Sequence, residues 1–576
     1  MRAWSGERIE FLKVVLVNVL LMNLARFGDI LQSRAAVSDL VRRGHRVGMV
    51  CLENFVPAAR LLPCLDHIAP LPGAFLLARL KERRARGGFD AARAPAEEFR
   101  SEADGTDWPA ALAGIADFRR RLHSEFPPDL VCNLTPDTSA KVLTRFLANG
   151  GDCSGFFVDE NGFGVNGNNW AAFFVGSSLE RGISPFNVVD MFRKIASDIP
   201  GGPGLRDAFP TPGDVSLFRP GKKARLGARR LLGEAAGDDV NGHVAFQLGA
   251  SEDRRRWPAG SFAALGDILW REAKLCPVLL GSASERRLAE AYADLAAHPY
   301  LDLCGRTDLA ELSAVLCRVK LLVSNDTGTM HLAAGLNVPI LAVFLATAQP
   351  FDTGPYLAGS CCLEPDLPCH PCAFGSKCAF DLRCAQAIRP EFFAALILSR
   401  LRRGSWILPE DGSGKARVWL SRPDAHGFMD LQSVSGHGKA ERTVWLALQR
   451  RLLRDFLDGN GPSPPAPEET PDNPPLCAGR ETAAALNHAM ALTELLQQQS
   501  RLAARPTGAA MRQKLAGTWR MVYDALSANP DLRALALLFA QTCRGGNGEI
   551  PDLPRLAETS ENFHRLLANF SKALAR

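Results

Sequence analysis

The stretch that decides the fold is SNDTGTMHLAAG, residues 324–335. It follows the apolar run LLV (321–323), which is typical of the end of a buried strand, and it leads into a segment rich in Ala and Leu that predicts a helix. A strand, a glycine-containing loop and a helix start together direct free backbone N–H groups and the positive end of the helix dipole toward an anion. The stretch therefore predicts a site for a diphosphate.

Two further segments have the same design. VAFQLGAS (244–251) is a strand and a glycine loop, after which RRRWP (254–258) precedes a helix start at Ser261. PVLLGS (277–282) repeats the pattern, with Glu285 just inside the next helix. Three strand–loop–helix units with polar groups at the carboxyl ends of their strands predict a nucleotide site on a doubly wound sheet.

The N-terminal half opens in the same way. The hydrophobic pattern predicts a strand over 12–24, a helix over 30–43 and a strand over 47–51, which is a βαβ unit. We read residues 26–29 as the link from the first strand into a loop. Further along we expect strands over 129–134 and 156–158, a loop over 161–169 and a helix over 186–197.

These motifs resemble glycosyltransferase family 9, the heptosyltransferases that build bacterial lipopolysaccharide cores. The resemblance covers roughly residues 12–400 and rests on GASEDRRRWP, LLGSASE, LCGRTDLAELSAVL, SNDTGTMHLAAG and DTGPY, and on NLARFGDILQS in the N-terminal half. It implies an α/β fold of the GT-B type, in which two Rossmann-like domains face each other. It also implies transfer of a heptose, with inversion, from ADP-heptose or another nucleotide-sugar donor to a lipopolysaccharide core or a related acceptor.

The expected organisation has five parts. An N-terminal acceptor domain covers 12–200, and a Pro- and Gly-rich passage (199–220) connects it to a donor domain over 221–400 that carries a cysteine cluster. Beyond residue 400 the resemblance ends. We expect a small accessory segment over 401–458, a Pro-rich linker over 459–480 and a helical module over 481–576 that serves packing or homo-oligomerisation.

Asp29 is the expected catalytic residue. Glycosyl transfer needs a base that takes the proton of the acceptor hydroxyl, and a carboxylate at the mouth of a cleft can do this. The resemblance assigns that role to the Asp of a Gly-Asp element, which Gly28 and Asp29 match. The alternative is that Asp29 only caps the following helix.

The donor-binding residues follow from the same resemblance. Arg255 occupies the position that contacts the donor phosphate, for which a guanidinium is well suited because it donates two parallel hydrogen bonds. Glu285 matches the acid that holds the ribose. The alternatives are exposed arginines over 254–256 and a glutamate on a helix surface, and we expect Trp257 to pack in the core. The full expected donor set is Gly28, Ser251, Arg255, Glu285, Asp326, Thr327, Gly328, Thr329 and His331.

No cofactor is expected to be required for catalysis. Arginine and helix N-terminal amides can stabilise the charge that develops on a nucleoside diphosphate leaving group, and the chain shows no clear Asp-x-Asp element. A separate cluster, Cys369, Cys372, Cys378 and Cys384, has spacing that suits a structural iron or zinc ion. Reduced thiols and disulfides are the alternatives.

Composition sets the remaining limits. The 576 residues are 47% hydrophobic and 22% charged, and the net charge of +5 does not by itself favour nucleic acid. Fifteen scattered cysteines do not resemble a secreted disulfide framework, and the apolar run 14–22 is too short to span a bilayer. We therefore expect a cytoplasmic protein. A basic cluster is either a solvated helix face or a contact with an anionic acceptor or the inner membrane; its members are Arg79, Lys81, Arg83, Arg84 and Arg86.

Two rival functions stay open at this stage. The same fold could glycosylate a protein such as an autotransporter or flagellin, which the cysteine cluster and the C-terminal helices favour. A non-catalytic sugar-nucleotide-binding protein is the second rival, and Asp29 argues against it.

Overall fold

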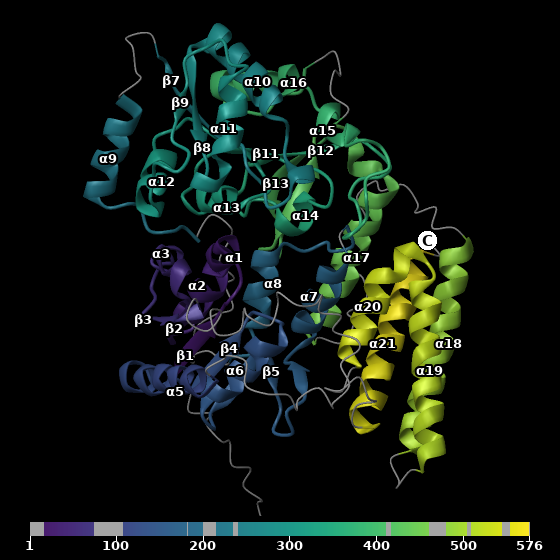
Figure 1. Cartoon of the computed structure of the whole chain (residues 1–576). Coiled ribbons are helices and arrows are strands. Elements are labelled where there is room, and N and C mark those ends of the chain that lie inside the picture. Colours follow the sequence, from purple (N-terminus) through teal and green to yellow (C-terminus); the bar gives the residue numbers. More distant parts are fainter. Residues whose placement is uncertain are drawn as a thin grey trace, which may run out of the picture.

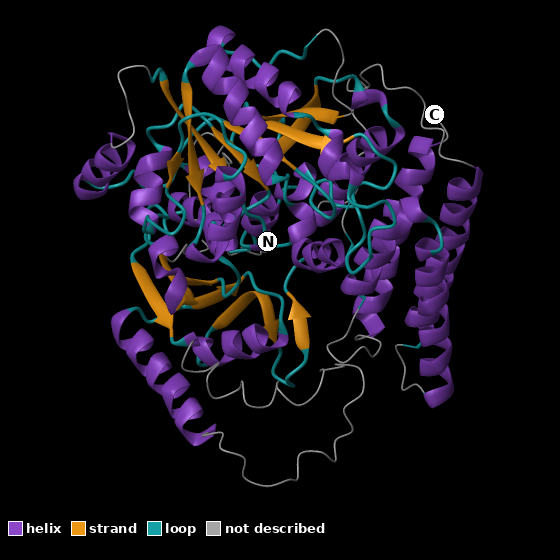
Figure 2. Ribbon diagram, turned by 45° about the horizontal axis from the view of Figure 1, so that its top comes forward, coloured by secondary structure: helices purple, strands orange, loops and turns teal. Residues whose placement is uncertain are grey.

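The chain forms two domains, each built on a sheet of mostly parallel strands, and the two domains lie against each other (Figures 1 and 2). A group of long helices runs along one side of the molecule. The first sheet belongs to the N-terminal half and the second to the centre of the chain. The basic cluster at 79–86 and most of the two expected linkers lie outside the described residues. The computed structural model describes residues 17–73, 108–180, 182–199, 215–233, 240–409, 416–459, 480–503, 508–543 and 553–574.

The first sheet has the strand order β3-β2-β1-β4-β5-β6, and all neighbouring strands are parallel except β5 and β6. Its central strand β1 is buried on both faces because Val19 to Met22 are all apolar and fully enclosed, as expected inside a parallel sheet. The strands are β1 (Asn18–Met22), β2 (Arg46–Leu52), β3 (His67–Leu71), β4 (Leu130–Asn133), β5 (Asp152–Val158) and β6 (Gly164–Asn166). The last of these lies inside 161–169, so the expectation of a loop there was wrong.

Helices cover both faces of this sheet (Figure 2). The helix expected over 30–43 is two helices, which begin at Phe27 and are separated at Ser33. Residues 27–29 are thus the first turn of a helix and not a loop. The helices are α1 (Phe27–Gln32), α2 (Arg34–Arg42), α3 (Val56–Ala59), α5 (Trp108–Glu125), α6 (Thr138–Ala148), α7 (Asn169–Leu179) and α8 (Val188–Ile195).

The second sheet has the order β14-β13-β12-β11-β10-β7-β8-β9. The strands from β12 to β9 are parallel, and β13 and β14 are added antiparallel at one edge. These two strands come from 401–458, so part of the expected accessory segment completes the donor-domain sheet. The strands are β7 (Gly242–Gln247), β8 (Leu275–Leu280), β9 (Leu301–Asp302), β10 (Leu322–Asn325), β11 (Ile340–Val343), β12 (Cys361–Pro365), β13 (Ala416–Pro423) and β14 (Met429–Ser433).

The helices of the second domain follow its strands in the alternation that the sequence predicts. Trp257 packs in the core between them, with its ring 4.2 Å from that of Phe393. The helices are α9 (Lys222–Gly233), α10 (Ala259–Ala273), α11 (Arg286–Ala293), α12 (Leu309–Leu316), α13 (Gly328–Gly335), α14 (Pro350–Thr353), α15 (Arg383–Ala387) and α16 (Pro390–Arg403).

The C-terminal helices return to the first domain. α17 (Glu441–Leu457) leads from the second sheet to α7, and α20 packs along α7. Arg533 of α20 pairs with Glu180 at 2.6 Å, and the Trp170 indole donates to Asp458 at 2.8 Å. The chain beyond residue 457 thus supports the first domain from outside. Its helices are α18 (Arg480–Leu502), α19 (Ala509–Ser527), α20 (Arg533–Thr542) and α21 (Leu553–Leu574).

Candidate functional site

A cavity of about 620 Å³ lies between the two domains. On one side are the carboxyl ends of β7, β8 and β10, and on the other are α1, α7 and α8. This is the edge at which open α/β sheets bind their ligands. All the residues that the sequence nominated for catalysis and donor binding line it, namely Gly28, Asp29, Ser251, Arg255, Glu285, Asp326, Thr327, Gly328, Thr329 and His331.

Asp29 enters the cavity from the first turn of α1. Its carboxylate accepts the backbone N–H of Arg26 at 3.0 Å, which closes a capping interaction at the start of the helix. The Asn23 amide donates to the Asp29 carbonyl at 3.1 Å and so ties this turn to the end of β1. Asp29 therefore caps the helix and faces the cavity at once, and the two interpretations of this residue do not exclude each other.

The starts of α1 and α13 meet across the domain boundary. A Cβ on Gly28 would lie 3.2 Å from His331 Cδ2 and 3.4 Å from the Cα of Gly328, and a Cβ on Gly328 would collide with the ring of Phe27. Both glycines are needed for this close approach. Gly28, expected in the donor-binding set, faces the other domain and also borders the cavity.

His331 is neutral in this boundary. Burial, together with the nearby Arg34 guanidinium, lowers its pKa to about 3. The Gln32 amide lies 3.1 Å from His331 Nε2, so it can donate to the unprotonated ring nitrogen. A ring that stays neutral near pH 7 suits a structural or phosphate-proximal position and not that of a charged acid.

Arg255 is the buried cation of the donor side. It is only 6% exposed, its Nε donates to Thr347 Oγ1 at 2.7 Å, and its Nη1 donates to Ser251 Oγ at 3.3 Å. Asp326 Oδ2 lies 3.8 Å from Nη1. These partners hold the guanidinium at the cavity wall, where it can meet an anion.

The flanking arginines behave differently from each other. Arg256 also lines the cavity. Arg254 turns away: its Nη1 donates to the Ser376 carbonyl at 2.7 Å, in the segment that carries the cysteines. The sequence motif RRR therefore contributes two of its three side chains to the cavity.

Asn325 organises the donor loop, and the sequence analysis missed it. Its amide nitrogen donates to the carbonyls of Gln247, Leu248 and Gly249, at 3.3, 2.9 and 3.2 Å. Its oxygen accepts the Trp257 N–H at 2.9 Å. One buried side chain at the end of β10 thus fixes both ends of the loop that presents Ser251 and Arg255.

Glu285 lines the cavity from the turn before α11. Its carboxylate accepts the N–H and the hydroxyl of Ser282 at 2.7 and 2.9 Å, which caps the turn before α11. A Cβ at Gly249 would collide with this carboxylate, so the glycine loop after β7 makes room for it. Like Asp29, Glu285 is both a cap and a lining residue.

The wall that α7, α8 and the turn between them contribute to the cavity was not predicted. It consists of serine and apolar side chains, namely Phe174, Ser177, Ser178, Ser184, Val188 and Met191. No motif marks such residues, because apolar helix faces occur throughout the core. Asp352 and Thr353 complete the donor side, and the Thr353 hydroxyl donates to Asp326 at 3.3 Å.

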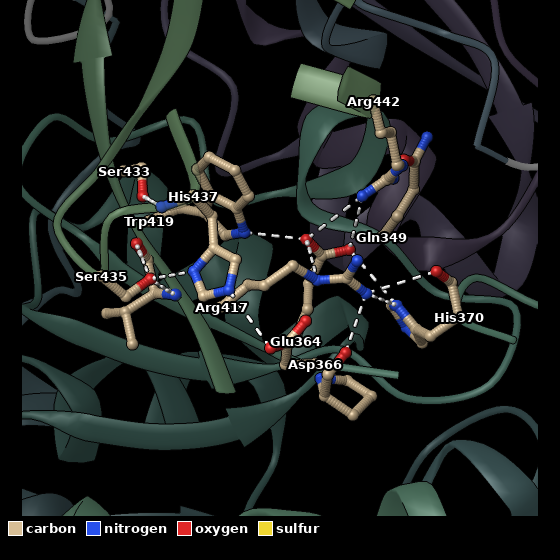
Figure 3. A network of polar contacts seen from close by, with 12 residues as sticks. Gln349, Glu364, Asp366, His370, Arg417, Trp419, Ser433, Ser435, His437 and Arg442 are labelled. Atoms are coloured by element: carbon tan, nitrogen blue, oxygen red, sulfur yellow. Dashed lines mark hydrogen bonds and ion pairs between the residues drawn. The ribbon is translucent and has the colours of Figure 1, made fainter. Parts of the chain in front are cut away.

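A buried carboxylate, Glu364, lies in a network of polar contacts with Trp419 and Arg442 (Figure 3). Glu364 on β12 is fully enclosed and accepts the Trp419 indole N–H at 2.7 Å. Burial disfavours its charge, but Arg442, His370, Arg417 and the Trp419 hydrogen bond together outweigh this and hold its pKa below the usual range. Arg442, on α17, also donates to Gln349 at 2.7 Å, the residue that precedes α14. The helix that returns to the first domain is thereby bonded to the segment that brings Asp352 and Thr353 to the cavity.

The four cysteines of the cluster surround a second cavity, of about 330 Å³. Two backbone N–H groups, of Phe380 and Leu382, donate to the Cys378 sulfur at 3.5 and 3.4 Å and lower the pKa of that thiol. All four thiols are free. Among the described residues, no three His, Cys, Asp or Glu side chains are grouped closely enough for a metal site, so these thiols would have to draw together to hold one.

Within the ranges given above, no helix combines the length and the hydropathy of a membrane-spanning segment.

Comparison with known proteins gives a family match within the second domain. Residues 219–381 match the model of glycosyltransferase family 9 (heptosyltransferase). The chain is 33% identical over 134 residues to lipopolysaccharide heptosyltransferase 1 of Pseudomonas aeruginosa, which covers 23% of this chain and 36% of that protein. It is 37% identical over 104 residues to lipooligosaccharide heptosyltransferase 2 of Haemophilus ducreyi, covering 17% and 29%. The chain thus spans about a third of the length of the curated relatives that it matches.

Similar solved structures include a family 9 glycosyltransferase from Veillonella parvula, with a TM-score of 0.42, 16% identity, and coverage of 59% of this chain and 83% of that one. Another is the E. coli heptosyltransferase WaaC with ADP, with a TM-score of 0.39, 18% identity, and coverage of 59% and 91%.

Proposed function

Since the second domain of this chain belongs to glycosyltransferase family 9 over residues 219–381, we propose that the protein transfers a sugar from a nucleotide donor to an acceptor in the cavity between its domains. The names of its relatives suggest that the sugar is a heptose and that the acceptor is a lipopolysaccharide. The resemblance of its motifs to the family suggests that the donor is ADP-heptose and that the sugar is added to the lipopolysaccharide core. One observation carries the proposal. The cavity places a carboxylate of one domain, Asp29, opposite the anion-binding edge of the other.

The donor would lie along the second sheet. The diphosphate meets Arg255 and the start of α13, where the Thr329 N–H group and the helix dipole favour negative charge. Glu285 accepts the ribose hydroxyls. Because these groups are already in place, they stabilise the charge that builds on the leaving nucleoside diphosphate.

The acceptor would enter between α7 and α8 and present its hydroxyl to Asp29. The Asp29 carboxylate takes the hydroxyl proton as the oxygen attacks the anomeric carbon, and the bond from that carbon to the diphosphate breaks. Attack on the face opposite the leaving group inverts the anomeric centre. The steps named here use side chains and amides of this chain alone.

The test separates binding from chemistry. Asp29→Asn keeps an oxygen that can accept the Arg26 N–H, so the helix start is retained while the basic carboxylate is lost. We expect turnover to fall by about 10²–10⁴-fold, with nearly unchanged affinity for the nucleoside diphosphate by titration calorimetry. Asp137→Asn is the matched control, because Asp137 caps α6 outside the cavity. Turnover near that of the wild type in Asp29→Asn would remove this carboxylate from the mechanism.

A further inference from the structure

One exposed helix carries an unusual concentration of positive charge. α9 has the sequence KKARLGARRLLG and contains five cations and no acid. It lies at the outer margin of the second domain, beside α12 (Figure 1). The five cations, all exposed, are Lys222, Lys223, Arg225, Arg229 and Arg230.

Two large apolar side chains are exposed in or near this helix. Leu226 is 47% exposed within the helix, and Phe218, four residues before the helix, is 53% exposed. Successive residues of an α-helix are rotated by about 100°, so the five cations all lie within one half of the helix circumference. Leu226 lies near the middle of the arc that they occupy. Ala228 and Leu232 are buried on the other half, against the domain. Leu226 therefore lies within the basic face and not on the side of the helix that packs against the domain.

The cations of this face are not neutralised by neighbours. Within the residues that the structure describes, none of the five forms an ion pair with a carboxylate. The nearest acid of α12, Glu311, lies against Gly227 on the packed side of the helix and accepts the Asp308 N–H of its own helix start. The exposed side of the helix thus carries five cations that have no ion-pair partner among the described residues.

We propose that α9 docks the protein on an anionic phospholipid bilayer. Basic helices that bind such surfaces place apolar side chains into the headgroup region while Lys and Arg contact the lipid phosphates. Leu226 is what distinguishes this face from one that binds nucleic acid, because phosphate contacts alone give no reason for an apolar side chain at the centre of the face. The inference concerns a surface outside the cavity, so its test does not require transfer activity.

The experiment measures sedimentation of the full chain with vesicles. The vesicles contain phosphatidylethanolamine and phosphatidylglycerol, with phosphatidylcholine vesicles as the neutral reference. The variant Arg225→Gln, Arg229→Gln, Arg230→Gln removes three charges but keeps helix propensity. Each surface cation strengthens binding to anionic lipid about fivefold, so the partition coefficient should fall on the order of 100-fold. The matched control is Arg512→Gln, Lys514→Gln, Arg520→Gln on α19, which changes the net charge equally and should leave binding nearly unchanged.

A second variant separates lipid from other polyanions. Leu226→Gln should weaken vesicle binding by about tenfold, because it removes the apolar insertion, and should not alter binding to heparin or RNA. The proposal is overturned if wild-type protein does not prefer anionic vesicles, if the α19 control loses as much binding as the α9 variant, or if Leu226→Gln binds vesicles as well as the wild type does. Tighter binding to RNA than to vesicles would assign the face to nucleic acid instead.

Discussion

At the scale of single residues, Arg255 should decide donor affinity. Its guanidinium is buried at the cavity wall with Thr347, Ser251 and Asp326 around it. Hydrogen bonds to charged groups contribute about 1.5–3 kcal/mol each, so Arg255→Ala should weaken ADP binding by about 10–100-fold in titration calorimetry. The ADP affinity of Arg255→Lys should lie between those of the wild type and Arg255→Ala, because lysine keeps the positive charge but cannot donate two parallel hydrogen bonds.

Arg254→Ala is the control for this variant. Arg254 is adjacent in sequence, but its guanidinium donates to the Ser376 carbonyl and does not line the cavity. We expect it to bind ADP as the wild type does. Equal losses in both variants would mean that the charge of the RRR motif, and not the buried position of Arg255, determines affinity.

His331 should leave a signature in the pH dependence of stability. Its pKa is about 3 in the folded protein and 6.5 when exposed, so the unfolded chain binds more protons between these values. The stability from this residue is fully present above pH 6.5 and is lost as pH falls toward 3, by at most about 1.4 kcal/mol per pH unit. In His331→Gln, the free energy of unfolding measured with denaturant should change less with pH between 3 and 6.5 than it does in the wild type. An unchanged slope would show that the ring is already protonated or solvated in the folded state.

At the scale of elements, α7 connects the C-terminal helices to the acceptor wall. A Cβ on Gly176 would lie 3.2–3.3 Å from backbone and Cβ atoms of Leu537 on α20. Helical periodicity puts Phe174 and Ser178, which line the cavity, on the opposite side of α7. Gly176→Val should therefore force α20 away and destabilise the protein by about 1–3 kcal/mol.

Gly517→Val provides the comparison. Gly517 lies in α19, and nothing approaches its Cβ position within 4 Å, so this change alters helix propensity without a clash. Thermal unfolding should show a clear loss for Gly176→Val and little change for Gly517→Val. Equal effects of the two substitutions would contradict the packing of α20 on α7 at this point.

The cysteine segment makes a separate prediction. If Cys369, Cys372, Cys378 and Cys384 draw together around iron or zinc, elemental analysis should find about one metal ion per chain, and Cys378→Ser should lose it and lower the unfolding temperature. Chelation should not stop turnover at once, because the leaving group is handled by Arg255 and backbone amides. Metal-free protein of full stability would indicate plain thiols, and an immediate, metal-reversible loss of turnover would indicate a catalytic metal.

The alternation of strands and helices could be predicted because it is local. Apolar runs followed by glycine loops identified β7, β8 and β10 and their helices. The start of α1 was misplaced, because its cap is the reverse hydrogen bond from Arg26 N–H to Asp29, and Arg26 is not a residue that signals a cap. β13 and β14 were not joined to the second sheet, because antiparallel pairing with β12 is a long-range contact.

At the scale of the whole molecule, the two halves of the site differ in how far the sequence could predict them. The donor half follows from motifs in which each polar residue ends a strand, so its members had to meet at one sheet edge. The acceptor half depends on how the first domain faces the second, and on helices such as α7 that carry no motif. Asn325 was missed for the same reason: its partners lie 68–78 residues away along the chain.

The most direct measurement of the central claim is acceptor-dependent release of ADP from ADP-heptose by the full chain. The acceptor is lipopolysaccharide core that lacks its heptose, and mass spectrometry follows the gain of one sugar on the acceptor. The account predicts that ADP is released only when the acceptor is present and that the acceptor gains one heptose. In Asp29→Asn, ADP release and heptose transfer should both be lost, while ADP binding is retained. Tight binding of ADP by wild-type protein, with no transfer from any nucleotide-sugar in a panel, would contradict it and leave a sugar-nucleotide-binding protein.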